Sequence, residues 1–262
     1  MNEQLWEIVR GEGPLVATAI HDGHEIRAEV AEKLAISDSD RLREEDPYTG
    51  PLTAVAGTRI VVRRSRFEVD LNRRREKAVY RRPEDAWGLQ VWKGDVTEEI
   101  VARSLELYDG FYREVHRILT ELTYKHGYFV VFDLHSYNHR RGCPGGLPAP
   151  TEENPEVNVG TGTMDRAKWG PLVDRFMEDL RTFDFLGRKL DVRENVKFRG
   201  GHFSHWIHES FPGAGCSLAI EYKKFFMDEW TGVRNMAEHD AMKKSLMATI
   251  SGIHESLKAL KG

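Results

Sequence analysis

The sequence has few cysteines, no long apolar run and no marked excess of charge of one sign. Its two cysteines, Cys143 and Cys216, are too far apart in the 262 residues to form a metal-binding cysteine cluster. Two thiols in a chain whose start is acidic, with no basic and apolar leader, are typical of a cytoplasmic protein. Any bound metal would therefore be held by histidine and carboxylate, and the chain has 11 histidines.

The composition gives no reason to expect a membrane or a nucleic-acid partner. No apolar run approaches the length of about 20 residues that crosses a bilayer, and the formal net charge is −4. The segment 59–82 is rich in arginine, which would suit a solvated basic face or a nucleic-acid patch. The acidic balance of the whole chain, and the lack of aromatic residues interleaved regularly with these arginines, argue against nucleic acid.

Apolar periodicity predicts alternating helices and strands in a single domain over residues 1–262, with no internal repeat and no linker. Strands are expected at 15–20, 59–63, 66–71, 128–132 and 216–222, and helices at 24–35, 97–126, 165–186 and 236–260. The segment 140–162 is rich in glycine and proline and is expected to be a loop near the site. This alternation predicts a three-layer α/β/α fold with a mixed central sheet.

Polar side chains follow two of the predicted strands. His21 follows strand 15–20, and Asp133-Leu134-His135-Ser136-Tyr137 follows strand 128–132. Because open α/β sheets bind ligands at the carboxyl ends of their strands, these clusters are candidates for a site. The run Glu44-Glu45-Asp46 stands between them and precedes a proline, so it is expected on a loop. Two histidines and one carboxylate, with a position left for water, form the ligand set of a catalytic zinc site.

Each of these signals also has an ordinary structural interpretation. His135 could be a core histidine with satisfied hydrogen bonds, and the acidic run could be a solvated turn. Glu221 is more unusual, because an apolar strand rarely carries a charge without a partner or a task. Asn72 and Arg73 offer an amide donor beside a planar guanidinium, a pair suited to a carboxylate, although Arg73 could merely pair with a neighbouring acid.

Three longer stretches together resemble the N-formylglutamate amidohydrolase family, also called N-formylglutamate deformylase. They are Ser65–Arg73, Asp133–Ser136 and Leu218–Glu221. Shorter elements agree with that family in order and spacing, namely His21-Asp22-Gly23, Glu45-Asp46-Pro47, Asn158–Thr161 and Phe198–Gly201. The resemblance therefore covers about residues 15 to 225.

The resemblance implies a fold similar to that of zinc carboxypeptidases and of the aspartoacylase and succinylglutamate desuccinylase group. It implies one divalent metal ion, zinc, held by His21, His135 and a carboxylate near residue 46. It also implies that Glu221 is the base that activates water. Asn72 and Arg73 would then clamp a substrate carboxylate, with Arg66 and His202 as further candidates for substrate contact. His202 opens a stretch with histidines at 202, 205 and 208, which could equally be a solvent-facing element.

The sequence departs from these patterns at two places. Zinc carboxypeptidases take a histidine and a glutamate from one His-x-x-Glu element, whereas His24 stands at that spacing after His21. Asp46 is therefore preferred as the acidic ligand, with Glu45 as the alternative. The family more often has serine where this chain has Asp22, which affects the surroundings of the metal and not the metal itself.

The expected function is hydrolysis of the amide bond of a small N-acyl amino acid, N-formylglutamate by family resemblance. The expected partner is a small acidic substrate, and the oligomeric state is left open. A zinc carboxypeptidase or amidase acting on peptides or on another N-acyl amino acid is the nearest alternative. A non-catalytic binding protein on the same fold is a third, which the presence of Glu221 disfavours.

Overall fold

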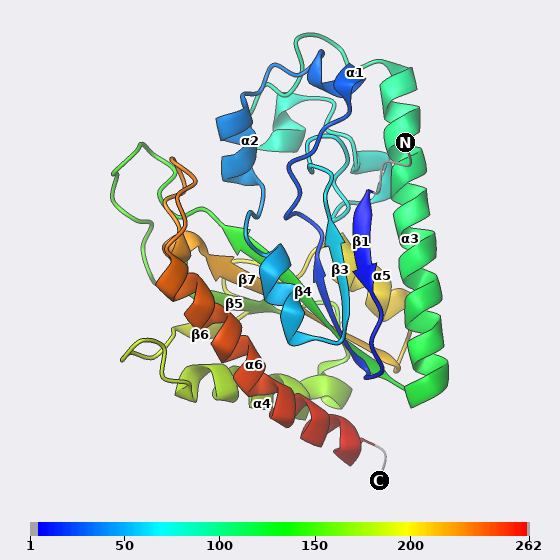
Figure 1. Ribbon diagram of the computed structural model, residues 1–262, viewed down its shortest axis with the longest axis vertical. Helices are drawn as coiled ribbons and strands as arrows, with labels where there is room; N and C mark the ends of the chain where they lie inside the picture. The colour runs from blue at the N-terminus through cyan, green and yellow to red at the C-terminus, as the bar shows by residue number, and fades with distance from the viewer. Residues whose placement is uncertain (1–4, 261–262) are drawn as a thin grey trace.

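A computed structural model describes residues 5–260, and a mixed sheet of seven strands forms the centre of this part of the chain (Figure 1). The strands are β1 (Trp6–Val9), β2 (Leu15–Ala19), β3 (Thr58–Val62), β4 (Phe129–Tyr137), β5 (Val157–Gly160), β6 (Val192–Glu194) and β7 (Gly215–Lys223). Their order across the sheet is β1-β3-β2-β4-β7-β5-β6. Strands β3, β2, β4 and β7 run parallel, whereas β1 and β5 pair antiparallel with β3 and β7.

Helices cover both faces of this sheet. Helices α3 (Glu98–His126) and α5 (His202–Ser210) pack on one face, and α4 (Arg166–Thr182) and α6 (Met236–Ala259) pack on the other (Figure 1). The shorter helices are α1 (Ala28–Ala31) and α2 (Asp38–Glu44), with 3₁₀ helices at Gly50–Val55, Arg75–Lys77, Pro83–Ala86 and Lys224–Phe226. The predicted three-layer α/β/α fold with a mixed sheet is therefore confirmed.

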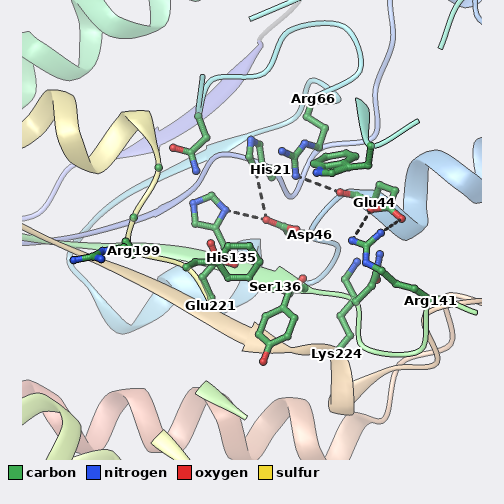
Figure 2. A pocket seen from close by; sticks show the side chains of 17 residues that line it. His21, Glu44, Asp46, Arg66, His135, Ser136, Arg141, Arg199, Glu221 and Lys224 are labelled. Carbon is green, nitrogen blue, oxygen red and sulfur yellow. Dashed lines mark hydrogen bonds and ion pairs between the residues drawn. The ribbon is translucent and has the colours of Figure 1, made fainter. Parts of the chain in front are cut away.

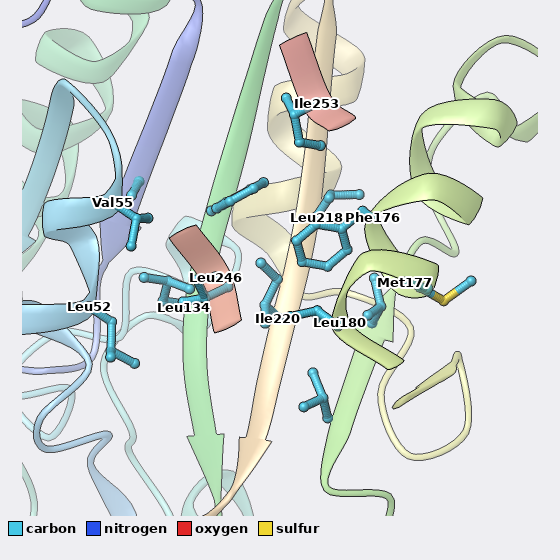
Figure 3. Packing of buried hydrophobic residues seen from close by; sticks show 14 of the residues in the cluster. Leu52, Val55, Leu134, Phe176, Met177, Leu180, Leu218, Ile220, Leu246 and Ile253 are labelled. Carbon is cyan, nitrogen blue, oxygen red and sulfur yellow. The ribbon is translucent and has the colours of Figure 1, made fainter. Parts of the chain in front are cut away.

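Alternation along β4 divides the core between the two faces. Val131 joins the cluster under α3 and α5, whereas Phe132 and Leu134 join the cluster under α4 and α6. Figure 3 shows Leu134 in that second cluster together with Leu218 of β7 and Phe176 of α4. Because β4 and β7 are buried on both faces over most of their length, a polar side chain within them needs a specific partner or a cavity.

Local signals set the ends of the longest helix as predicted. The Thr97 hydroxyl accepts a hydrogen bond from the amide of Ile100, and Gly127 ends the helix with a φ of 81°. The predicted helices over 165–186 and 236–260 correspond to α4 and α6, and the predicted strands over 15–20, 59–63 and 216–222 correspond to β2, β3 and β7.

Two predicted elements are wrong. Residues 66–71 form turns and not a strand, because their polar groups bond locally: the amide of Phe67 donates to Ser65 Oγ, and that of Asn72 donates to Asp70 Oδ1. Only Ala28–Ala31 of the predicted helix 24–35 is helical. The chain before it is extended, since Glu25 exchanges backbone hydrogen bonds with Arg63 and Ser65.

The sheet is also larger than predicted. β4 continues through Tyr137 because it pairs in parallel with β7 as far as Lys223, so the polar cluster 133–137 lies inside the strand and not after it. β5 lies within the predicted loop 140–162. Its four buried residues were not predicted as a strand because the surrounding segment is rich in glycine and proline. The edge strands β1 and β6 were not predicted. Among residues 5–260, no helix has both the length and the apolar character needed to cross a bilayer.

Candidate metal centre

Three residues that are distant in sequence meet at the carboxyl ends of the central strands. His21 lies two residues after β2, His135 lies in the last third of β4, and Asp46 lies two residues after α2. The side chains of His21, Asp46 and His135 are all buried, and their ligand atoms lie within 4.8 Å of one another. The fold therefore brings together both predicted histidines and the preferred carboxylate.

Asp46 lies between the two imidazoles (Figure 2). Its Oδ2 atom is 2.9 Å from His135 Nδ1 and 3.4 Å from His21 Nδ1. Burial alone would raise the pKa of Asp46, but its contacts with His135 and His21 outweigh burial and lower the pKa well below the usual range. His21 Nδ1 has no hydrogen-bond partner among the described residues, although it is buried.

Two further carboxylates hold the far sides of the histidine rings. His21 Nε2 is 2.8 Å from Asp70 Oδ1, and His135 Nε2 is 3.1 Å from Asp133 Oδ2. Such carboxylates fix the tautomer and the orientation of a metal-binding imidazole, here with Nδ1 facing Asp46. In the sequence, Asp133 stands two positions before His135, where a carboxylate can orient the ring, whereas Asp70 was expected only as a partner of Arg73. The signal available was their position in the motifs Asp70–Arg73 and Asp133–Ser136.

These contacts fit a metal ion. A buried imidazole nitrogen without a hydrogen bond, a second imidazole nitrogen and a carboxylate oxygen point to one place, and each histidine has a carboxylate behind it. Nitrogen and oxygen donors in this combination suit zinc.

Glu45 is engaged elsewhere. One of its carboxylate oxygens is 2.5 Å from His24 Nδ1, and the other accepts hydrogen bonds from Ser65 and Arg41. Among the described residues, the histidine and carboxylate group that could hold a metal contains Asp46 and not Glu45. Asp22 also lies aside, because its carboxylate accepts a hydrogen bond from the amide of Gly50 at 2.8 Å.

Glu221 lies beside the three clustered residues without belonging to them. It is the residue opposite His135 in the parallel pairing of β4 and β7. Burial raises the pKa of Glu221 to about 7; the nearby charge of His135 lowers it, and those of Asp46 and Asp133 raise it. A carboxyl group with a pKa near neutrality can accept and release a proton under ordinary conditions.

The clustered residues open into a cavity of about 240 Å³ (Figure 2). Its charged lining consists of Arg66, Arg141, Arg199, Lys224, Glu44, Asp46 and Glu221. Its aromatic lining residues are Trp87, Tyr137 and Phe198, and its neutral polar lining residues include Asn72, Ser136 and Asn138. The sequence did not single out Arg141, Asn138 and Lys224, whereas Ser136 and Arg199 stand in motifs that it did single out.

Only some of the predicted substrate-binding residues line the cavity. Asn72 and Arg66 line the cavity, and the Arg66 guanidinium donates to Asp70 Oδ2 at 2.8 Å. Arg73 is not among the lining residues; its Nε is 3.5 Å from Asp70 Oδ2, and its guanidinium lies over the ring of Tyr80. Its clamping role stays a prediction, and the structure favours a pairing with Asp70 in this form of the protein.

His202 begins α5 next to the cavity wall. The adjacent Gly201 lines the cavity and approaches Asn72 so closely that a Cβ on residue 201 would lie 2.3 Å from Asn72 Oδ1. Asn72 Oδ1 accepts a hydrogen bond from the amide of Phe203 at 3.0 Å and so anchors the helix start. His202 contacts the ring of Tyr112 and is not among the lining residues, so its role in substrate binding also stays a prediction.

A comparison with protein families identifies the chain. The family model described as N-formylglutamate amidohydrolase matches residues 13–224. The chain belongs to the N-formylglutamate amidohydrolase family. The matched range contains the three clustered residues, Glu221 and every residue that lines the cavity. No curated protein matches the sequence.

Solved structures agree with the fold of this N-formylglutamate amidohydrolase family member. The crystal structure of N-formylglutamate amidohydrolase from Ralstonia eutropha JMP134 matches with a TM-score of 0.74 and 18% identity, covering 97% of this chain and 98% of that chain. A gene product from Agrobacterium tumefaciens matches with a TM-score of 0.72 and 18% identity, covering 98% and 96%. At these identities the similarity establishes the fold alone. A metallo-carboxypeptidase from Burkholderia cenocepacia reaches only 0.38, which supports no conclusion.

Proposed function

We propose that this protein is a metal-dependent amidohydrolase that cleaves the amide bond of a small N-acyl amino acid, and that its substrate is N-formylglutamate. The observation that carries the proposal is the meeting of His21, Asp46 and His135 with Glu221 in one cavity, in a member of this family. The set has two nitrogen ligands, one oxygen ligand and a separate carboxylate, which is the division of roles that metal-assisted hydrolysis requires.

The residues would divide the work as follows. His21, His135 and Asp46 would hold a zinc ion, while Asp70 and Asp133 keep the two imidazoles in the binding orientation. A bound zinc ion polarises an acyl carbonyl and makes water more acidic. Glu221 accepts the proton of the attacking water and passes it to the departing amine.

Charge and size support a small acidic substrate. Four cationic and three acidic side chains line the cavity, so a divalent ion would leave it clearly positive. N-formylglutamate carries two carboxylates at neutral pH, which would offset most of this excess. The volume of about 240 Å³ is below the about 300–1,000 Å³ of pockets for drug-sized ligands. The carboxypeptidase alternative would favour a long groove for a peptide, and a cavity of this volume does not support it.

A substrate screen on the metal-loaded protein tests the proposal. Amine release would be measured with N-formylglutamate, N-formylglutamine, N-acetylglutamate and a dipeptide that ends in glutamate. We expect N-formylglutamate to give the highest kcat/KM, and a chelator to abolish turnover until zinc is restored. Turnover that survives chelation, or a preference for the dipeptide, would overturn the proposal.

A further inference from the structure

Lys224 is a buried cation with no carboxylate in direct contact among the described residues. The residue is 1% exposed, lines the cavity and follows directly after β7. Its ammonium donates hydrogen bonds to the carbonyl oxygens of Arg43 at 2.5 Å and Glu45 at 2.7 Å. Among the residues that the structure describes, it forms no ion pair within 4.0 Å. Buried charges are ordinarily paired in direct contact, whereas the carboxylates whose charge acts on Lys224, first among them Asp46, lie beyond that distance.

The ammonium is held in place. Lys223 is opposite Tyr137 in the pairing of β7 and β4, so Lys224 and Asn138 leave the sheet side by side. Asn138 Nδ2 donates to the same Arg43 carbonyl at 2.8 Å, which fixes the backbone that Lys224 contacts. An ammonium group has three donors, and two are used by these carbonyls. The third remains for a ligand.

A second polar group in the cavity also lacks a partner. Ser136 lies on β4 opposite Tyr222, is 6% exposed and lines the cavity. Its hydroxyl makes no hydrogen bond to any described residue. A buried hydroxyl that is left unpaired costs free energy of about 1–3 kcal/mol. An oxygen-rich anionic group bound there would satisfy both Ser136 and Lys224.

We propose that Lys224 and Ser136 form a subsite that binds a carboxylate of the amino-acid part of the substrate. This inference rests on the proposed function, which supplies a substrate with two carboxylates, and it names the residues that select for one of them. Figure 2 shows Lys224 and Arg141 at the end of the cavity away from Arg199. Arg141 forms a bidentate ion pair with Glu44, whereas Lys224 has no carboxylate within 4.0 Å among the described residues.

A structural role for Lys224 makes a different prediction. If Lys224 only fixed the backbone around Glu45, its loss would displace Asp46, reduce the zinc content and affect charged and uncharged ligands alike. A carboxylate-binding role predicts normal zinc content with a selective loss of charged ligands. Lys223 is the matched control, because it is also buried, its ammonium donates to the carbonyl of Asn154 at 3.1 Å, and it does not line the cavity.

Calorimetric binding of glutarate, and of the uncharged glutaramide, to the zinc-loaded protein tests the proposal without turnover. Lys224→Gln retains donors for the two carbonyls but removes the charge. We expect it to lose glutarate affinity by about tenfold or more, with zinc content and glutaramide binding unchanged and with Lys223→Gln like the parent. Unchanged glutarate affinity, loss of zinc or an equal effect of Lys223→Gln would overturn the proposal.

A second variant keeps the test decisive if Lys224→Gln does not fold. Ser136→Ala removes a hydroxyl that has no internal partner, so the fold should tolerate it. We expect it to weaken glutarate binding about threefold to tenfold; parent-like affinity would contradict the subsite. If glutarate binding depends on Lys224 but no N-acyl amino acid is hydrolysed, the proposed function fails and the subsite stands. If Lys224→Gln hydrolyses N-formylglutamate with the parent KM, the subsite fails and the proposed function stands.

Discussion

His135 Nδ1 lies 2.9 Å from Asp46 Oδ2, although 89 positions separate the two residues in sequence. Burial alone would lower the pKa of His135, but the charge of Asp133 and the hydrogen bond with Asp46 raise it well above the usual value. In the hydrogen bond between these two side chains, a proton lies between Nδ1 and Oδ2. A metal ion would replace that proton and hold the same two side chains together.

Asp133 should position His135 without binding the metal itself. Its Oδ1 accepts a hydrogen bond from Thr18 at 3.0 Å, and its Oδ2 is 3.1 Å from His135 Nε2. Asp133→Asn should weaken zinc binding about 10- to 100-fold, the usual effect of losing such a partner. Competition with a chelator measures this affinity. Ser204→Ala, which removes a hydrogen bond of 3.4 Å to the same carboxylate and one of 2.9 Å with Ser217, should have a much smaller effect on zinc affinity.

Glu221 should act as the general base and not as a metal ligand. Glu221→Gln should keep zinc and lower kcat by about 10²-fold or more, because the amide cannot accept the proton of water. Parallel measurements of zinc content and of amine release separate the two roles. Near-normal turnover would contradict the assignment, and loss of zinc would make Glu221 a ligand instead.

Glu221 should also destabilise the metal-free protein at neutral pH. Its folded pKa of about 7 exceeds the ordinary value of 4.5, so ionisation opposes folding. The unfolding free energy of Glu221→Gln should equal that of the parent below about pH 4.5 and exceed it increasingly up to about pH 7. The full shift corresponds to at most about 3 kcal/mol. Urea titrations across this range would show no pH-dependent gain if the pKa were normal. The exposed Glu106→Gln serves as control.

Substitution of Arg73 tests the prediction that its guanidinium binds a substrate carboxylate. If its guanidinium binds a substrate carboxylate, Arg73→Lys should lose much of the activity on N-formylglutamate, because one ammonium cannot replace the paired donors. Uncharged amides of the same compound should be affected far less. Equal losses on both would identify Arg73 as a structural partner of Asp70, from which its Nε is 3.5 Å away.

The sequence predicted the elements whose periodicity is strong, and it selected the candidate site residues that stand in or after apolar runs. His21, His135 and Glu221 could be selected because β2, β4 and β7 are apolar and a polar residue stands out in or after them. Asp46 could not be separated from Glu45 by pattern alone. Glu45 is unavailable to the metal because its carboxylate contacts Ser65, Arg41 and His24. The sequence alone does not show these contacts.

Other parts of the candidate site depend on contacts between segments, which the periodicity of a single segment does not show. Residues 66–71 alternate like a strand, but local bonds to Ser65 and Asp70 keep them in turns that carry Arg66 to the cavity. The sequence does not mark Lys224 as a site residue, because two adjacent lysines such as Lys223 and Lys224 are ordinarily exposed. Only the pairing of β7 with β4, and the approach of the Arg43 carbonyl, show that it is buried.

The zinc content of four purified proteins tests the central claim most directly. After loading with zinc and dialysis, the parent and Glu45→Gln should each retain one zinc ion per chain, whereas His135→Ala and Asp46→Asn should retain almost none. All four should unfold cooperatively, so that loss of metal is not loss of fold. Full occupancy in His135→Ala or Asp46→Asn, or a parent that retains no metal, would contradict the account of a centre built from His21, Asp46 and His135.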